Sequence, residues 1–408
     1  MFHISNYRMH RMKEFMIIRN FGPIENVEIK LKRINLFIGE QGVGKSTIAK
    51  LYSCMQDVLL HFLIVFSRDQ QKIKAIFQRY GIHTYFNDDT YIEFGTNTGL
   101  IVKYEGQKFT ISSPTLNKAE IEIYVIRLIS DSVTHSLKGA GLSVGDDFDS
   151  LPEKEKEIMF SNLRTSFYLP AERSLLGCTS NSLSSLLLAK VPLPKMLMEF
   201  LSFFEKAKNE YQEYEVPFLG LTFKASQSED KIQIGDKEIA FKYCSSGIQS
   251  IVPMLMIVDY CLKQDYFSCF ALEEPEINLF PTNQLELIRY IISKVNQEKG
   301  INNLIITTHS PYILSIINVS ILAGKVAEMT PQLADEVSAV LRPEFYLHSS
   351  EIEVFSLGKD INGGTECESI FDSQTGLIKG NYLDAVSSII SADFNKLNKI
   401  YIKALREQ

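Results

Sequence analysis

The spacing of apolar positions changes from a strand-like to a helix-like period within the first 66 residues. Residues 15–19 and 27–31 alternate or run apolar around the turn Phe21-Gly22-Pro23, which predicts a hairpin of short strands. Residues 34–38 form a continuous apolar run, typical of a buried strand, and a glycine-rich loop follows it. Residues 45–66 then have a helical pattern. The sequence therefore predicts a strand, a loop and a helix in that order.

The middle of the chain combines short strands with long helical segments. Residues 118–208 have mostly helical periodicity, interrupted by a loop near Gly145 and by prolines, and we expect them to form a helical insertion. Before this region, three strand-like segments punctuated by Gly and Asn predict a small antiparallel sheet: residues 91–94, 100–104 and 108–111.

Parallel strands are expected in the second half of the chain. The apolar runs 267–272 and 303–307 predict two buried strands, and the helical residues 282–299 separate them. A strand, a helix and a strand in this order form a βαβ unit and hence a parallel sheet. Further elements are predicted around this unit, namely strands at 221–224, 231–234, 238–242 and 351–355, a helix at 247–262 and an amphipathic helix at 382–405.

Composition narrows the class of protein. The 408 residues are 45% apolar and 22% charged, which is ordinary for a folded globular protein. The formal net charge of -7 argues against a globally basic surface that binds nucleic acid nonspecifically, and leaves room only for local basic patches. Scattered cysteines without a CxxC pair predict reduced thiols. No apolar run approaches the roughly 20 residues of a spanning helix, so we expect a cytoplasmic protein without a membrane partner.

The glycine-rich loop has the pattern of a phosphate-binding loop. Residues 39–47 match GxxxxGK[ST] between a predicted strand and a predicted helix. Glycines let backbone N–H groups surround phosphates, and the helix N-terminus adds a partial positive charge. We expect Lys45 to hold the β- and γ-phosphates and Ser46 to bind Mg²⁺. The residues expected to bind the nucleotide here are Gly39, Gln41, Gly42, Gly44, Lys45, Ser46 and Thr47.

Paired carboxylates follow the predicted strand 267–272. Glu273 and Glu274 stand where a Walker B element delivers one carboxylate to the Mg²⁺ shell and the next to the attacking water. Two glutamates after a strand are also compatible with a solvated sheet edge. The phosphate loop upstream favours the functional interpretation, with Glu273 as a metal ligand and Glu274 as the catalytic group.

The other predicted buried strand ends in Thr308-His309-Ser310-Pro311. A single histidine at a strand end often has only a structural role. Because ligands gather at the carboxyl ends of strands in open α/β sheets, we expect His309 to contact the γ-phosphate.

A serine-rich segment, Ser245-Ser246-Gly247, precedes the predicted helix at 247–262. Its plain interpretation is an N-cap serine followed by a flexible glycine. Its place just before the acidic strand also suits a loop that contacts a nucleotide.

In order, the phosphate loop, the Ser-Ser-Gly segment, the acidic strand and the Thr-His-Ser strand resemble the four nucleotide-contacting motifs of ABC-type ATPases. The soluble SMC, RecF and OLD group is the most similar. Its members begin with a Phe-Gly-Pro-Ile turn, and they share the sequence Glu-Glu-Pro-Glu at the acidic strand. The resemblance covers residues 14–60 and 240–320 well. It implies ATP and Mg²⁺ as cofactors, a catalytic role for Glu274, Lys45 and His309, and a signature loop of Ser245 and Gly247 that caps the ATP of another protomer.

Three features depart from the family pattern. Glu273 stands where many ABC enzymes have aspartate, and Cys244 replaces the leucine that usually leads the signature. A glutamine loop is expected, but none of the glutamines in the inserted region is assigned to it.

The resemblance implies an α/β fold, a P-loop NTPase head of the ABC type with a mixed sheet and antiparallel edge strands. It divides the chain into four parts. They are an ATPase lobe with the phosphate loop and an antiparallel subdomain (14–117), a helical insertion (118–215), an ATPase lobe with the signature, Walker B and switch histidine (216–330) and a small α+β C-terminal extension (331–408).

The function implied by the resemblance is a molecular switch. Two heads close on ATP as a homo-oligomer, at least a dimer, and couple hydrolysis to DNA sensing or to a separate effector such as a nuclease or toxin, in anti-phage defence or DNA maintenance. The acidic residues after Asp335 lack the pattern of a TOPRIM nuclease. Residues 168–173 look like a segment of OLD-like ATPases. The resemblance implies that Arg173 reaches the nucleotide or the partner head. The alternative is a surface arginine at the start of a helix.

Three other functions compete with the switch. The nucleotide-binding subunit of an ABC transporter is the main alternative, although such a subunit is shorter and has a fuller signature. A noncatalytic ATP-binding scaffold conflicts with the intact Lys45, Glu274 and His309. A GTPase is disfavoured because no NKxD motif follows the phosphate loop.

Overall fold

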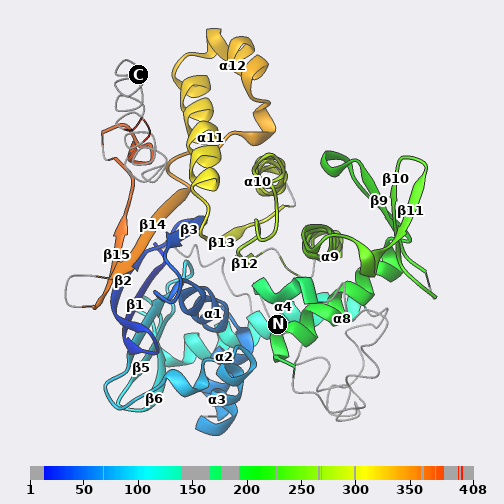
Figure 1. Ribbon diagram of the computed structural model, residues 1–408. Coiled ribbons are helices and arrows are strands. Elements are labelled where there is room, and N and C mark those ends of the chain that lie inside the picture. The colour runs from blue at the N-terminus through cyan, green and yellow to red at the C-terminus, as the bar shows by residue number, and fades with distance from the viewer. Residues whose placement is uncertain are drawn as a thin grey trace, which may run out of the picture.

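The computed structural model describes most of the chain (Figure 1). The helix predicted at 382–405, apart from Phe394 and Leu397, and the loop predicted near Gly145 lie outside the described residues. The described residues are 13–67, 69–139, 166–175, 193–226, 228–264, 267, 269–297, 300–359, 363–372, 374–380, 394 and 397.

A six-stranded mixed sheet forms the centre of the molecule, in the order β15-β14-β3-β13-β12-β7. Every neighbouring pair is parallel except β14 and β15, which pair antiparallel at the edge. The parallel β12 and β13 confirm the βαβ unit that the sequence predicts. The bounds are β3 (Ile34–Gly39), β7 (Ser166–Leu169), β12 (Cys269–Glu273), β13 (Asn303–Thr308), β14 (Ile352–Lys359) and β15 (Thr365–Ser369).

Strands β3, β13, β12 and β7 are buried on both faces, which explains why they have continuous apolar runs. Leu36, Leu272 and Ile306 point to one core, and their neighbours Phe37 and Ala271 point to the other. In Figure 1, α10 and α11 lie above β3, β13 and β12, and α1 lies below these strands. The covering helices are α1 (Lys45–Met55) on one face and α8 (Lys195–Glu210), α9 (Ser246–Lys263), α10 (Pro281–Asn296) and α11 (Pro311–Met329) on the other.

Two antiparallel sheets flank the central one. The first has the order β2-β1-β4-β5-β6 and contains the predicted hairpin, whose turn residue Gly22 has a φ of 56°. The second has the order β11-β10-β9-β8. Their bounds are β1 (Phe15–Phe21), β2 (Ile24–Lys30), β4 (Tyr91–Gly95), β5 (Ile101–Glu105), β6 (Lys108–Ser112), β8 (Glu213–Val216), β9 (Leu221–Lys224), β10 (Lys231–Ile234) and β11 (Lys237–Ala240).

The helix predicted from 45 to 66 is interrupted at Asp57. This side chain accepts a hydrogen bond from the backbone N–H of Leu59 and so caps a new helix. A capping side chain competes with continuation of the preceding helix. The result is α1, then α2 (Val58–Phe62) and a π-helix (Leu63–Ser67).

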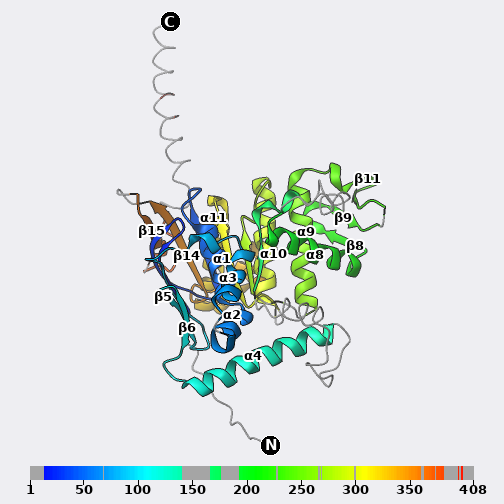
Figure 2. The same ribbon diagram turned by 90° about the horizontal axis from the view of Figure 1, so that it is seen from below.

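The remaining helices are peripheral or short. The long helix α4 (Lys118–Gly139) runs past α2 along one edge of the molecule (Figure 2). The others are α3 (Gln70–Arg79), α12 (Ala334–Val340) and 3-10 turns at His83–Tyr85, Ala171–Ser174, Pro217–Leu219, Phe241–Tyr243, Pro331–Leu333 and Pro343–Phe345.

Three strands of the central sheet come from ranges expected to lie outside it. β7 falls within the expected helical insertion, and β14 and β15 fall within the expected C-terminal extension. β7 has only four residues, too few for a period, and a short apolar run does not distinguish a strand from a buried helix. The central sheet is therefore assembled from segments along nearly the whole chain.

Among the described helices, α11 is long and apolar enough to cross a membrane by length and composition alone, and α1 with the α2 segment passes only as a bent pair. In the fold, α11 packs against α10 and α12, and its Ile313, Leu314 and Ile317 are buried in the core. Core helices of globular proteins have the same composition, so α11 is weak support for a membrane span. The absence of a membrane partner stays a prediction.

Gly324 in α11 offers a test of this packing. A Cβ added there would lie 2.5 Å from the carbonyl oxygen of Leu347. Helix propensity favours alanine by about 1 kcal/mol, whereas overpacking costs about 1–3 kcal/mol. We expect Gly324→Ala to lower the free energy of unfolding by about 1 kcal/mol, measured by thermal denaturation. Gly358→Ala is the control, because no atom lies within 4 Å of its added Cβ. Equal stability of the two variants would contradict the packing described.

Candidate functional site

The phosphate loop joins β3 to α1 in the conformation that its glycines permit. Gly42 and Gly44 have φ values of 78° and 107°, a region that residues with a Cβ rarely adopt. Gly44 is also the N-cap residue of α1. The loop therefore aims the N-terminus of α1 and its unpaired N–H groups at a common point.

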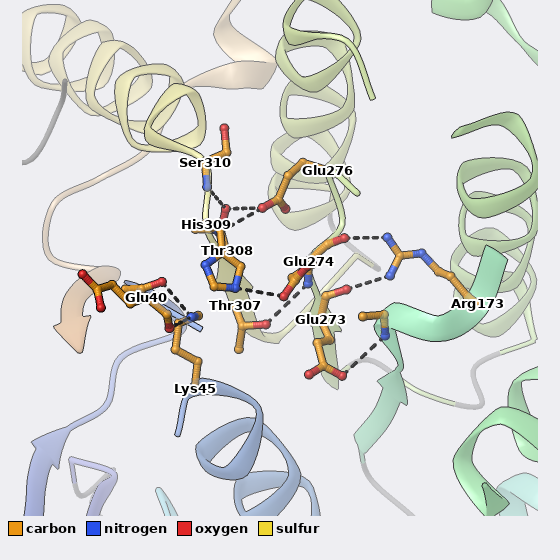
Figure 3. A network of polar contacts seen from close by, with 12 residues as sticks. Glu40, Lys45, Arg173, Glu273, Glu274, Glu276, Thr307, Thr308, His309 and Ser310 are labelled. Atoms are coloured by element: carbon orange, nitrogen blue, oxygen red, sulfur yellow. Dashed lines mark hydrogen bonds and ion pairs between the residues drawn. The ribbon is translucent and has the colours of Figure 1, made fainter. Parts of the chain in front are cut away.

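Lys45 lies folded over this loop. Its Nζ donates hydrogen bonds to the carbonyl oxygens of Gly39 and Glu40, both at 2.7 Å (Figure 3). Burial lowers the pKa of Lys45, and the neighbouring Glu274, Glu276 and Glu273 oppose this shift. The ammonium group thus stands between the loop carbonyls and three carboxylates, where a triphosphate would supply alternative anionic partners.

A cavity of about 460 Å³ lies over the loop. It brings together Glu274, His309 and all of the predicted phosphate-loop residues except Gly39, and these segments come from the ends of three strands. It also includes Tyr85 and the β1–β2 turn, which the sequence analysis did not assign to the site. Its lining consists of Gly22, Pro23, Gln41, Gly42, Gly44, Lys45, Ser46, Thr47, Tyr85, Glu274 and His309.

Glu274 and His309 form a pair across this cavity. His309 Nε2 lies 3.0 Å from Glu274 Oε1 (Figure 3). The backbone N–H of Glu274 donates to the carbonyl of Thr307 at 2.9 Å. This hydrogen bond fixes residues 273–278, which we call the acidic turn, to β13. Glu274 has a φ of 43°, a left-handed conformation that is uncommon for residues other than glycine. Such outliers concentrate at functional sites, where surrounding contacts hold them.

Glu276, which the sequence analysis did not assign, holds the histidine strand to the same turn. Its Oε1 accepts hydrogen bonds from Thr308 Oγ1 at 2.5 Å and from the N–H of His309 at 3.1 Å. Burial raises the pKa of Glu276, and these two hydrogen bonds oppose the rise. Its place in the Glu-Glu-Pro-Glu segment was the available signal for this role.

Glu273 is turned away from the cavity. Its Oε2 accepts hydrogen bonds from the Tyr168 hydroxyl and, at 3.4 Å, from the N–H of Ala171, and the residue does not line the cavity. Within the described residues, no group of three or more His, Cys, Asp or Glu side chains could hold a metal ion. Mg²⁺ is usually held by one or two protein ligands together with substrate phosphates and water. Ser46 and Glu274, which both line the cavity, fit that requirement, whereas Glu273, the residue predicted as the metal ligand, does not line it.

The Ser-Ser-Gly segment lies outside the cavity. Ser245 is the exposed N-cap residue of α9, and its side chain makes no capping hydrogen bond. Gly247 is buried against the acidic turn, where an added Cβ would lie 2.6 Å from the carbonyl oxygen of Asn278. This close approach requires glycine independently of any nucleotide. Within its own chain, the segment therefore contacts the acidic turn but does not line the phosphate cavity.

Arg173 occupies neither of the positions expected from the sequence. Its side chain is 0% exposed, so it is no surface arginine and offers no contact to a partner head. Its guanidinium group is directed at carbonyl oxygens of β12 and the acidic turn, and it does not line the phosphate cavity. Burial lowers the pKa of Arg173 to about 10, and Glu276, Glu273 and Glu274 oppose this shift.

Comparison with known proteins agrees with this site. Residues 193–314, just under a third of the chain, match the family described as AAA ATPase domain. The match begins before α8 and ends in α11, so it includes Ser245, Glu274 and His309 but not the phosphate loop. A search of curated proteins gave no match.

Several solved structures are similar at low identity. The SMC head domain from Thermotoga maritima is 11% identical, with 89% of this chain and 100% of that chain covered and a TM-score of 0.40. The Smc head domain with an extended coiled coil from Pyrococcus furiosus, bound to the C-terminal domain of ScpA, is 11% identical over 87% and 95% of the two chains, with a TM-score of 0.40. At these values the similarity says nothing of what the present chain binds.

The family match lies on the half of the chain that carries the acidic turn and the histidine, and the fold joins that half to a complete phosphate loop. Both the phosphate loop and the matched ATPase domain family point to ATP as the ligand. The chain is therefore an ATPase.

Proposed function

We propose that the protein is an ATP-driven switch in which Lys45, Glu274 and His309 carry out hydrolysis and a second copy completes the site. The observation that carries this proposal is the convergence of these three side chains on one cavity from the ends of β3, β12 and β13. Lys45 binds the β- and γ-phosphates, and Ser46 with the carboxylates of the acidic turn holds Mg²⁺, which neutralises phosphate charge when bound.

Glu274 in the acidic turn is assigned the role of orienting the attacking water molecule. Glu274 accepts a hydrogen bond from a water molecule whose oxygen attacks the γ-phosphorus, and the bond to the β–γ bridging oxygen breaks to release ADP and phosphate. His309, 3.0 Å from the Glu274 carboxylate, orients that carboxylate and donates towards the γ-phosphate. Hydrolysis thus depends on a pair of side chains from two adjacent parallel strands.

A second copy of the chain is the proposed partner for the signature segment. Ser245 and Ser246 are exposed at the N-terminus of α9, the end of a helix that attracts phosphate. Two large aromatic side chains nearby are also exposed, Tyr243 at 75% and Phe280 at 71%. Aromatic residues are enriched in protein interfaces, and exposed apolar groups mark interaction sites. These features support a head-to-head dimer that closes on two ATP molecules.

The output of the switch is proposed to be DNA sensing or control of a separate effector protein, such as a nuclease or toxin, in anti-phage defence or DNA maintenance. The support is the resemblance of the motifs to OLD-like ATPases. Turnover measured with and without double-stranded DNA separates the two outputs. Stimulation of several-fold supports DNA sensing, whereas unchanged turnover favours effector control.

Nucleotide binding and hydrolysis are expected to be separable by substitution. Glu274→Gln keeps the size of the side chain but removes its charge, so we expect ATP to bind normally and turnover to fall about 10²- to 10⁴-fold. Lys45→Ala removes charge-assisted hydrogen bonds and is expected to weaken ATP binding about 10- to 100-fold. Binding is measured by calorimetry and turnover by phosphate release. Parental turnover in Glu274→Gln would refute the catalytic assignment.

ATP is expected to drive association of the heads. In Glu274→Gln, the mass measured by sedimentation is expected to double with ATP and to stay monomeric with ADP, which lacks the γ-phosphate. Adding Ser245→Arg blocks the signature segment by bulk and charge and is expected to abolish the ATP-dependent dimer. Ser67→Arg, at an exposed serine at the end of the π-helix, is the matched control and should dimerise normally.

A constitutive dimer would not change in mass, so cross-linking between the two nucleotide sites then reports the approach of the heads. If neither assay responds to ATP and Ser245→Arg leaves turnover unchanged, the head-to-head mechanism is wrong and a generic P-loop ATPase remains.

A further inference from the structure

Arg173 binds the backbone of the acidic turn from the side opposite the phosphate loop. Its Nη1 donates to the carbonyl oxygens of Pro170 at 3.0 Å and Glu273 at 2.7 Å, and its Nη2 donates to the carbonyl oxygen of Glu274 at 2.6 Å (Figure 3). The planar guanidinium group thus links the 3-10 turn Ala171–Ser174 to two consecutive peptide groups of the Walker B element. One of them belongs to Glu274, whose left-handed φ needs surrounding contacts to persist.

The same short segment also binds the side chain of Glu273. The Tyr168 hydroxyl and the N–H of Ala171 both donate to Oε2 of this carboxylate. β7 brings them there, because it pairs with β12 in parallel register, Leu169 opposite Leu272. Residues 168–173 therefore hold both glutamates, one by its side chain and both by their carbonyls. We call residues 168–173 the bracket.

We propose that Arg173 is a positioning residue for ATP hydrolysis: through the bracket it fixes the backbone of Glu273 and Glu274 so that the Glu274 carboxylate faces His309 and the cavity. This inference rests on the proposed catalytic role of Glu274. Arg173 itself lies outside the cavity and touches no part of it that would bind the nucleotide. Its removal should therefore impair turnover and spare binding.

Stability alone is a poor explanation of a fully buried arginine. A buried charge loses its hydration, and apolar residues of similar volume often serve a fold equally well. One donor of Arg173, Nε, has no hydrogen-bond partner among the described residues, which is a further cost. What a guanidinium group supplies here, and an apolar side chain does not, is a rigid fork that binds two carbonyls at once. It also places a positive charge beside Glu273, Glu274 and Glu276.

The chain offers a matched control at the other end of the same sheet. Arg33 also donates to several backbone carbonyls, those of Val295, Ile301 and Asn302, beside the amino end of β3. It joins segments of the fold without approaching the nucleotide cavity. Arg33 is partly exposed and also pairs with Glu351 at 3.2 Å, but both arginines bind backbone carbonyls, and Arg33 does so far from the nucleotide cavity.

The experiment compares Arg173→Lys with Arg33→Lys in the full chain. Lysine keeps the positive charge but lacks the planar guanidinium group that binds two carbonyl oxygens at once. For Arg173→Lys we expect kcat to fall about 10- to 100-fold, as misplacement of a reacting group by a fraction of an ångström does, and the Kd for ATP to stay within about twofold. Arg33→Lys should lower the melting temperature and leave kcat within about twofold of the parent. An unchanged kcat in Arg173→Lys, or a parallel loss of kcat and ATP affinity, would overturn the inference.

A double-mutant cycle shows whether Arg173 acts through Glu274. In the Glu274→Gln background, Arg173→Lys is expected to lower turnover by less than about threefold, because the group it positions is already inactive. Full additivity would overturn the inference. If Glu274→Gln instead turns over ATP at the parental rate, it is the proposed catalytic function that fails. An inactive Glu274→Gln with a fully active Arg173→Lys defeats only the positioning role.

Tyr168→Phe tests the bracket if Arg173→Lys does not fold. It removes a single hydroxyl from a buried ring and leaves the volume almost unchanged. We expect kcat to fall about three- to tenfold while the Kd for ATP without Mg²⁺ is unchanged, because only the Glu273 carboxylate is released. An unaltered kcat in this folded variant would count against the bracket.

Discussion

The parallel pairing of β3, β13 and β12 is the constraint on which the nucleotide site depends. In the register Thr308 lies opposite Ile38, and Glu273 lies opposite Thr307, so the three strands end at nearly the same level. The segments that follow them carry Lys45, His309 and Glu274. Because each strand is buried on both faces, a one-residue slip would exchange its two apolar surfaces and misplace these side chains together. The geometry of the site is thus set by the same apolar contacts that stabilise the fold.

Charge balance is the second requirement of the site. Three glutamates within four residues of the acidic turn would repel one another in a largely buried setting. Lys45 stands on one side of them and Arg173 on the other, and both cations interact with all three carboxylates. Lys45 is the cation that a triphosphate can engage, whereas Arg173 is fully buried and stays with the turn. The two positive charges therefore have separable roles, one towards the ligand and one towards the protein.

The part of the site that could be predicted from sequence is the part encoded locally. The phosphate loop is a contiguous run whose glycines, lysine and serine each have a stated use, and β12 and β13 are apolar runs that end in polar residues. The contribution of Arg173 could not be predicted, because its partners lie about 100 residues away and β7 is too short to show a period. The insertion of β14 beside β3 depends on tertiary contacts in the same way. The break at Asp57 is made instead by a local capping hydrogen bond from Leu59, which the helical period alone does not reveal. Sequence patterns thus indicated which residues to expect at the site, and the contacts that orient them became visible only in the fold.

The acidic turn also lies next to the proposed dimer interface at the N-terminus of α9. Gly247 packs against Asn278, four residues after Glu274, with no room for a Cβ. The N-terminus of α9, where a second copy would place its γ-phosphate in the proposed dimer, is therefore in direct contact with the turn that carries the proposed catalytic Glu274. On its other side the same turn is held by Arg173 and by the carbonyl of Thr307. In the proposed dimer, a movement of Ser245 on closure would be transmitted to the acidic turn by the close contact between Gly247 and Asn278, because tightly packed segments shift together. A short, strained turn held from three directions can thus link closure of one ATP site to the hydrolytic geometry of the other.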